Sequence, residues 1–279
     1  MNPALGAAIG EQLGAPLTET TALGRGFTDN WRGRAGGRHL FLKTSPDFDR
    51  LAAEADGLGA LADCPAVRCP AVLALGRAAG VAFLALEWLD IATDGDQARL
   101  GAALAELHER RGEAYGWGRD NYLGTTPQDN RPASDWAEFF ATRRLAPQLS
   151  LAQDRGCAAV AAPGQALLAR LPALLAGHRP PPALLHGDLW RGNAGFAQGH
   201  PCLYDPAVHF GDPECDLAMA ALFGGFSREF FAAYGACRPP LPGWPVRRRL
   251  YQLYHQLNHL NLFGAAYLPQ VLRTMEELP

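Results

Sequence analysis

The sequence predicts an α+β fold in two lobes, a small antiparallel-sheet lobe with one main helix and a larger, mainly helical lobe. Two observations predict it, since strand-like alternation prevails over residues 1–90 and helical periodicity over residues 91–279. A chain of 279 residues with 48% hydrophobic and 19% charged residues can bury a core of that size. We place the domain boundary after residue 90 and expect a cleft between the lobes.

The first lobe reads, in order, as a helix, two strands, a second helix and a hairpin that turns at Gly80. These elements are expected at residues 3–13, 17–23, 38–44, 49–62, 71–76 and 81–88. A Gly-rich stretch at residues 23–37 joins the first two strands. Alternation in the second strand puts Phe41 and Lys43 on one face and Leu40 and Leu42 on the other.

The second lobe shows helical periodicity almost throughout. Helices are expected at residues 96–111, 134–149, 164–176, 213–223, 227–235, 245–263 and 268–277. Between them, residues 183–212 read as loops and short strands, and they carry most of the polar residues that could perform chemistry.

Charge and cysteine content limit the class of protein. The net charge of −3, from 25 basic and 28 acidic residues, argues against binding to nucleic acid or a membrane surface. Neither a signal peptide nor an apolar run of about 18 residues occurs. The six cysteines lack metal-binding spacing, so we expect reduced thiols in a cytoplasmic protein. We also expect a monomer.

Lys43 is the only lysine in the chain, and all other basic residues are arginines. Codon bias explains why lysine is rare, but not why the single one lies at this position. Glu54 lies beside the apolar stripe of the helix at 49–62, where a carboxylate needs a cationic partner. A strand lysine paired with a helix glutamate is how kinases direct an ammonium group at nucleotide phosphates. A glutamate at the stripe edge that reaches solvent is an equally good interpretation.

Two segments of the first lobe could contact a nucleotide. Gly24 and Gly26 could let the backbone approach phosphates, although the stretch matches neither common phosphate-binding motif and a plain hairpin loop is favoured. In the connector, Glu87, Trp88 and Leu89 lie where the backbone would meet an adenine base. The side chains matter little there, so the residues alone do not prove that role.

The most specific signal is HGDLWRGN at residues 186–193. Asp188 precedes Asn193 by five residues and follows His186 by two, which is the HxDxxxxN spacing of a kinase catalytic loop. Phosphoryl transfer needs a carboxylate beside the acceptor hydroxyl and oxygen ligands on Mg²⁺. Asp205 follows an apolar run and supplies a second metal ligand, with room for a hairpin in between. We expect His186 to hold the loop rather than to transfer a proton.

Other polar residues have two interpretations each. Trp190 could stack on a sugar or anchor its loop, and Asn258 and His259 could bind an acceptor or, as we favour, bond between packed helices. A second metal site could include His209, Asp212 and Glu214, although helix capping and the helix dipole explain Asp212 and Glu214 more simply.

These motifs together resemble the fructosamine kinase (ketosamine-3-kinase) family, within the aminoglycoside phosphotransferase-like and protein-kinase-like superfamily. The resemblance covers nearly the whole chain and includes FLK at 41–43, DWAEFFATRRLAPQL at 135–149, HGDLWRGN at 186–193, YDPAVHFGDPECDLAMAALFGGF at 204–226 and YQLYHQLNHLNLFG at 251–264. The Gly-rich stretch departs from the family's usual core, since it carries Trp31 and Arg32. It contains no cysteine, so no disulfide is expected there.

The resemblance implies a bilobal protein-kinase-like fold and an ATP- and Mg²⁺-dependent phosphotransferase with an alcohol group as acceptor. The acceptor would be the sugar 3-hydroxyl of ketoamines, on small molecules or glycated protein lysines, and the phosphorylated adduct would then decompose and release the amine. The implied roles are catalytic base for Asp188, Mg²⁺ ligands for Asn193 and Asp205, phosphate binding for Lys43 with Glu54, and adenine contact for residues 87–89. The candidates for acceptor binding, Trp190, Asn258 and His259, come from the residues alone. We keep three alternatives: a kinase for aminoglycoside- or choline-type acceptors, a non-catalytic nucleotide-binding module, and a metal-dependent hydrolase.

Overall fold

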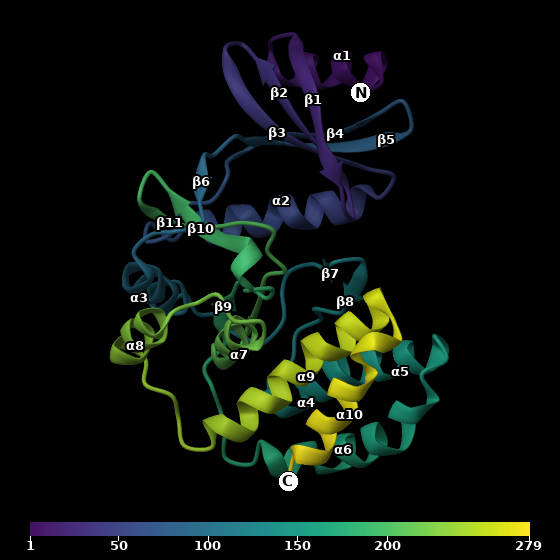
Figure 1. Cartoon of the computed structure of the whole chain (residues 1–279), viewed down its shortest axis with the longest axis vertical. Coiled ribbons are helices and arrows are strands. Elements are labelled where there is room, and N and C mark those ends of the chain that lie inside the picture. Colours follow the sequence, from purple (N-terminus) through teal and green to yellow (C-terminus); the bar gives the residue numbers. More distant parts are fainter. The chain divides into compact units, whose positions relative to one another are not determined.

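The computed structural model describes residues 1–279 and divides them into two compact units (Figure 1). Unit 1 comprises Met1–Gly95 and Ala194–Pro206, and unit 2 comprises Asp96–Asn193 and Ala207–Pro279. The division differs from a single boundary after residue 90, because residues 194–206 return to unit 1. The returning segment packs closely against Gly95, since a Cβ atom at that position would lie 2.4 Å from the ring of Phe196.

Unit 1 is built on a five-stranded antiparallel sheet with the strand order β1-β2-β3-β5-β4. Its strands are β1 (Leu17–Arg25), β2 (Asp29–Ala35), β3 (Arg38–Ser45), β4 (Val72–Ala78) and β5 (Val81–Glu87), and its helices are α1 (Pro3–Leu13) and α2 (Phe48–Ala62). Leu5 and Ile9 of α1 are buried with Leu40 and Leu42 of β3, so α1 covers one face of the sheet. The expected helix at 3–13 is therefore present, and unit 1 has two helices.

Strand β2 is a correction to the sequence analysis, which treated residues 23–37 as a loop. Gly36 and Gly37 form a two-residue turn to β3 with φ values of 56° and 80°, a backbone that favours glycine. The strand signal is weak because the two buried positions of β2 hold Gly33 and Ala35 instead of branched aliphatic residues. Hydrogen-bonded ladders to β1 and β3 stabilise it instead.

Helix caps explain where the helices of unit 1 begin. The side chain of Asn2 accepts a hydrogen bond from the Ala4 amide at 2.9 Å, and α1 ends at Gly14, which is left-handed with φ 69°. Asp47 caps α2 in the same way by accepting from the Arg50 amide at 3.2 Å. These caps fix α2 directly after β3, the strand that carries Lys43.

A second, three-stranded sheet completes unit 1. It consists of β6 (Ile91–Ala92), β10 (Ala194–Ala197) and β11 (His200–Leu203) in the order β11-β10-β6. The antiparallel pair β10–β11 is the hairpin expected between Asn193 and Asp205. Asn193 immediately precedes β10, and Asp205 follows β11 by two residues.

Unit 2 is mainly helical, as predicted. Its helices are α3 (Gln97–Leu107), α4 (Trp136–Phe140), α5 (Ala146–Asp154), α6 (Ala161–Leu174), α7 (Glu214–Leu222), α8 (Arg228–Cys237), α9 (Trp244–Phe263) and α10 (Leu268–Glu277). Two short antiparallel pairs join them: β7 (Asn121–Leu123) with β8 (Thr126–Gln128), and β9 (Ala183–Leu185) with β12 (His209–Gly211). No helix combines the length and apolar character needed to cross a membrane. The core gathers aromatic rings of α4 and α9, among them Trp136, Phe140 and Tyr251.

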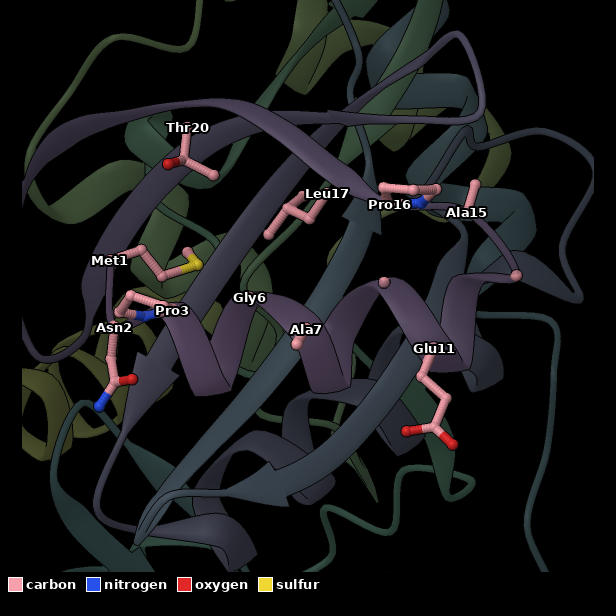
Figure 2. Close-up of a pocket in the computed structure, with 12 residues that line it drawn as sticks. Met1, Asn2, Pro3, Gly6, Ala7, Glu11, Ala15, Pro16, Leu17 and Thr20 are labelled. Atoms are coloured by element: carbon pink, nitrogen blue, oxygen red, sulfur yellow. The ribbon is translucent and has the colours of Figure 1, made fainter.

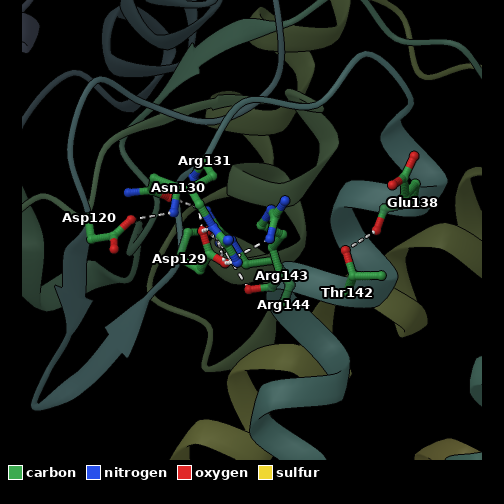
Figure 3. A network of polar contacts seen from close by, with 8 residues as sticks. All are labelled: Asp120, Asp129, Asn130, Arg131, Glu138, Thr142, Arg143 and Arg144. Carbon is green, nitrogen blue, oxygen red and sulfur yellow. Dashed lines mark hydrogen bonds and ion pairs between the residues drawn. The ribbon is translucent and has the colours of Figure 1, made fainter.

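The helix predicted at 134–149 is interrupted by a π-helical turn at Ala141–Leu145 between α4 and α5. Figure 3 shows that this turn directs Arg143 and Arg144 toward residues 129 and 130. Arg143 lies 2.7 Å from Asp129, and buried Arg144 donates to the Asn130 side chain at 2.6 Å. Hydrogen bonds from Arg131, aided by Arg143, hold the pKa of Asp129 well below its usual range. The π turn thereby ties the segment after β8 to the helical core.

Candidate active site

Lys43 is held between two carboxylates within unit 1. Its Nζ lies 2.7 Å from Glu54 Oε1 on α2 and also contacts Asp205 Oδ1. The side chain is buried, with 6% of Lys43 exposed. The predicted lysine–glutamate pair is therefore present, and the alternative in which Glu54 reaches solvent is wrong.

The charges of this cluster depend on one another. Burial opposes the charge on Lys43, but Asp205 and Glu54 outweigh it and raise the lysine pKa above its usual value, so the ammonium stays protonated. Burial raises the pKa of Glu54 to about 7, with Lys43 opposing that shift. Asp205 has a φ of 53°, a left-handed backbone that costs a non-glycine residue about 1 kcal/mol. The strained backbone therefore occurs at a residue whose side chain contacts Lys43.

A cavity of about 630 Å³ opens beside Lys43 in unit 1. It is bounded by the strand β3, the connector after β5 and the end of the β10–β11 hairpin, with Phe41, Lys43, Pro70, residues 86–92, Tyr204 and Asp205 in its wall. A second hollow of about 590 Å³ lies along α1 and the start of β1 (Figure 2). Glu11 is the only charged side chain in the wall of that second hollow. Phosphates need a cation, and of these two cavities only the one at Lys43 has a lysine in its wall.

The connector residues 87–89 line this cavity. The Glu87 carboxylate contacts Arg68 and accepts from the Ala71 amide at 3.3 Å. The Trp88 amide donates to the His39 carbonyl at 3.4 Å, which extends the pairing with β3. The Trp88 indole donates to Asp90 at 2.9 Å. These bonds hold the connector in place beside the cavity.

Gly24 and Gly26 belong to the β1–β2 hairpin, as the favoured interpretation of this stretch expects. A contact of their backbone with phosphate stays a prediction. Gly24 has φ 136° and open space around its Cα, since no atom lies within 4 Å of a Cβ built there. The Gly26 amide donates to the Thr28 carbonyl at 3.0 Å. That bond commits the amide to the turn, so it is not available to a phosphate in this conformation.

Asp188 and Asn193 are brought together within unit 2. Asn193 Nδ2 donates to the Asp188 carbonyl at 3.0 Å and to its carboxylate Oδ2 at 3.2 Å. His186 is buried and accepts from the Asp188 amide at 3.2 Å, which is the loop-holding role expected for it. Gly187 has φ 82°, and a Cβ there would lie 2.1 Å from the Ala207 carbonyl oxygen, so only glycine fits.

Asp216 fixes this loop, and the sequence analysis did not single it out. Its carboxylate, 1% exposed, accepts from the amides of His186 at 2.7 Å and Gly187 at 2.9 Å. His108 Nε2 lies 3.2 Å from the same carboxylate, and Tyr234 bonds to the other ring nitrogen at 2.8 Å. Although burial opposes ionisation, these bonds keep the pKa of Asp216 below its usual value. The signal available in the sequence was Asp216 itself, an acidic residue two positions after Glu214. The capping interpretation covered Asp212 and Glu214 and gave Asp216 no role of its own.

The three residues predicted to bind an acceptor have different surroundings. Trp190 is 42% exposed. His259 Nδ1 donates to the His255 carbonyl at 2.8 Å, and the His259 ring lies 4.8 Å from that of Phe223. Asn258 is not placed to bind an acceptor, because it is buried and its amide accepts from Gln148 at 3.1 Å and donates to the backbone. Asn258 therefore packs α9 against its neighbours, which was the favoured alternative.

Comparison with known proteins decides the family. The fructosamine kinase family matches residues 1–278. The chain belongs to the fructosamine kinase family. A Synechocystis protein assigned as a ketoamine kinase is 42% identical over 241 residues, covering 85% of this chain and 81% of that protein. A crystal structure from Thermobifida fusca, assigned as a fructosamine-3-kinase, is 34% identical, with a TM-score of 0.89 over 98% of this chain and 97% of that one.

A more distant neighbour confirms the fold. An aminoglycoside phosphotransferase solved with ADP and hygromycin B has a TM-score of 0.66 at 15% identity, covering 98% of this chain and 95% of that one. The predicted α+β, protein-kinase-like fold is therefore confirmed. This member of the fructosamine kinase family is a phosphotransferase that acts on a sugar hydroxyl.

One polar cluster of this kinase lies outside these groups. His178 Nε2 and the Tyr251 hydroxyl each lie 2.6 Å from Asp212 Oδ2. Glu214 forms a two-bond ion pair with Arg247 at 2.6 and 2.8 Å. Asp212 Oδ1 also accepts from the Glu214 amide at 3.0 Å. These carboxylates are engaged by cations and hydroxyls of the fold, which supports the capping and packing interpretation over a second metal site.

Glu214→Gln is expected to lower the free energy of unfolding by about 3–5 kcal/mol, because it leaves the buried Arg247 guanidinium without its counter-charge. Urea unfolding measures the change, and Glu277→Gln is the matched control, since its pair with Arg249 at 3.4 Å is exposed and worth about 0–1 kcal/mol. The paired change Glu214→Leu with Arg247→Met should recover most of the loss. Equal stability of Glu214→Gln and the control would contradict the structural role.

Proposed function

We propose that this protein is an ATP-dependent ketoamine kinase that phosphorylates the 3-hydroxyl of the acceptor sugar. The observation that carries the proposal is the hydrogen-bonded pair of Asp188 and Asn193 on the loop at 186–193, in a chain of the fructosamine kinase family. That spacing of carboxylate and amide is typical of enzymes that transfer the γ-phosphoryl group of ATP.

Unit 1 would bind the nucleotide. The backbone of residues 87–89 would meet the adenine in the cavity of about 630 Å³, and Lys43 would contact the phosphates. The role of Glu54, 2.7 Å from Lys43, is to hold the ammonium in position while phosphate replaces water around it. Lysine suits this task because its charge is compact and its stem reaches a fixed point.

Asn193 and Asp205 would hold Mg²⁺. Amide and carboxylate oxygens are the hard ligands that this ion accepts, so the donor set fits the metal. Because Asn193 turns Nδ2 toward Asp188, we assign its amide oxygen to the metal. Bound Mg²⁺ would neutralise phosphate charge as the phosphoryl group leaves ADP.

Asp188 would act as the catalytic base. Its carboxylate takes the proton of the sugar hydroxyl while the oxygen forms a bond to the γ-phosphorus and the bond from that phosphorus to the ADP oxygen breaks. Since the transition state is loose, most of the rate enhancement comes from position and charge. Trp190 and His259, both reachable by solvent, would contact the acceptor sugar.

Since none of the six cysteines forms a disulfide, we place the enzyme in the cytoplasm.

An acceptor panel tests the proposal. We expect ATP consumption with fructosyl, ribulosyl and erythrulosyl amines and with glycated lysine peptides, and none above background with aminoglycosides or choline. Phosphorus NMR of the product should place the phosphate on the 3-hydroxyl. A preference for an aminoglycoside or choline would contradict the acceptor class, and nucleotide binding without transfer to any acceptor would indicate a binding module.

A further inference from the structure

Arg32 lies on the face of the unit 1 sheet that carries Lys43. In the β2–β3 ladder Arg32 is paired with Phe41 and Asn30 with Lys43. Because side chains alternate along a strand and paired residues share a face, Arg32 projects on the same side as Phe41 and Lys43. The Arg32 guanidinium lies over the indole of Trp88, with Cζ 4.6 Å from the ring centroid.

The rings beside Arg32 belong to the cavity assigned to the nucleotide. Phe41 and Trp88 both line that cavity, and their ring centroids are 6.3 Å apart. Along β3, Phe41 precedes Lys43 by two residues, which is a separation of about 6–7 Å. Arg32 is therefore displaced from the phosphate-binding lysine toward the connector, where the base would lie.

Arg32 has no carboxylate partner, in contrast to the other arginines of its hairpin. Arg25 lies 2.9 Å from Asp29, and Arg34 lies 3.3 Å from Glu19. The contact of Arg32 is the Trp88 ring, and the side chain is otherwise exposed. A guanidinium group is planar and weakly hydrated, so it can stack on one aromatic system and offer its second face to another.

We propose that Arg32 binds the purine base of the nucleotide by stacking its guanidinium on the base, with Trp88 holding the guanidinium in place. The assignment rests on the proposed use of a nucleotide in this cavity. It gives a role to the arginine by which the stretch at 23–37 departs from the family's usual core. A base held by a stacked side chain depends less on contacts from the loop backbone, whose Gly26 amide is committed to its own turn.

Titration calorimetry on the full chain tests the assignment with three probes: ADP, adenosine and inorganic tripolyphosphate. The variants are Arg32→Met, which keeps the length of the side chain without the guanidinium, and Arg32→Lys, which keeps the charge without the planar group. Arg34→Met is the matched control on the same strand, and thermal unfolding checks that all variants fold.

Both Arg32 variants are expected to weaken ADP and adenosine by the same factor, about five- to thirtyfold, and to leave tripolyphosphate unchanged. Arg34→Met should change none of the three affinities. A loss confined to ADP and tripolyphosphate, restored by Arg32→Lys, would overturn the assignment in favour of a phosphate contact. Unchanged affinities would overturn it as well.

A second measurement separates stacking from a general effect on the fold. Trp88→Leu removes the ring beneath the guanidinium, so Arg32→Met should cost adenosine affinity in the wild-type background and little in that of Trp88→Leu. Additive losses would contradict the stacked arrangement. If the wild-type chain itself bound no ADP, the nucleotide use under Proposed function would fail first, which is a result distinct from loss at Arg32 alone.

Discussion

Asp188→Asn is expected to lower turnover on a ketoamine by about 10²–10⁴-fold, with ADP affinity nearly unchanged. The substitution removes the carboxylate that would accept the proton of the sugar hydroxyl, and it preserves the size of the side chain. In the unchanged protein Asn193 Nδ2 donates to the Asp188 carboxylate at 3.2 Å. The amide oxygen of the variant can still accept that hydrogen bond, so the loop should keep its shape. Steady-state kinetics with calorimetry of ADP binding measure both quantities.

The pattern of the loss matters as much as its size. Loss of the base alone should appear in kcat, with little change in the KM for ATP. Asp154→Asn, on the exposed end of α5, is the matched control and should leave both values as in the wild type. Turnover of Asp188→Asn within a few fold of the wild type would rule out Asp188 as the base, whereas loss of ADP binding would place Asp188 in nucleotide binding instead.

The sequence predicted best where chemistry demands particular residues at fixed spacing. The loop at 186–193 brings Asp188 to Asn193, and Lys43 meets Glu54, because a short turn and a strand–helix pair leave few other arrangements. The contact of Lys43 with Asp205 was not predicted, since 162 residues separate the two and only the fold brings them together.

Residues that act through the fold were harder to predict. Strand β2 has Gly33 and Ala35 at its buried positions, so it lacks the branched aliphatic residues that mark a strand. Its place depends on the ladders to β1 and β3, which local sequence does not reveal. Asp216 supports the loop at 186–193 from a position 28 residues after Asp188, and its partner His108 comes from a distant helix end. Asn258 has a side chain of the type that could bind an acceptor, but it is buried and bonds to Gln148 between packed helices.

Lys43→Arg is expected to lower kcat/KM for ATP by about 10²–10³-fold, although it keeps the positive charge. The Lys43 side chain is 6% exposed and its ammonium fits between Glu54 and Asp205, so a longer planar guanidinium has to displace one of them. Either displacement moves the charge away from the point where phosphate would lie. Arg38→Lys, the reverse exchange at the exposed start of the same strand, is the control and should have no effect.

Glu54→Gln separates charge from position in the same cluster. Asp205 still pairs with Lys43 in that variant, so its loss should be smaller than that of Lys43→Arg, whereas Lys43→Met should lose at least as much. In the proposed mechanism the lysine contacts phosphate and the glutamate positions the lysine, and this order follows from those two roles. Codon bias can replace lysine by arginine wherever a cation of either shape suffices. A Lys43→Arg enzyme with wild-type kcat/KM would show that a cation of either shape suffices at position 43. The single lysine of the chain would then have no functional explanation.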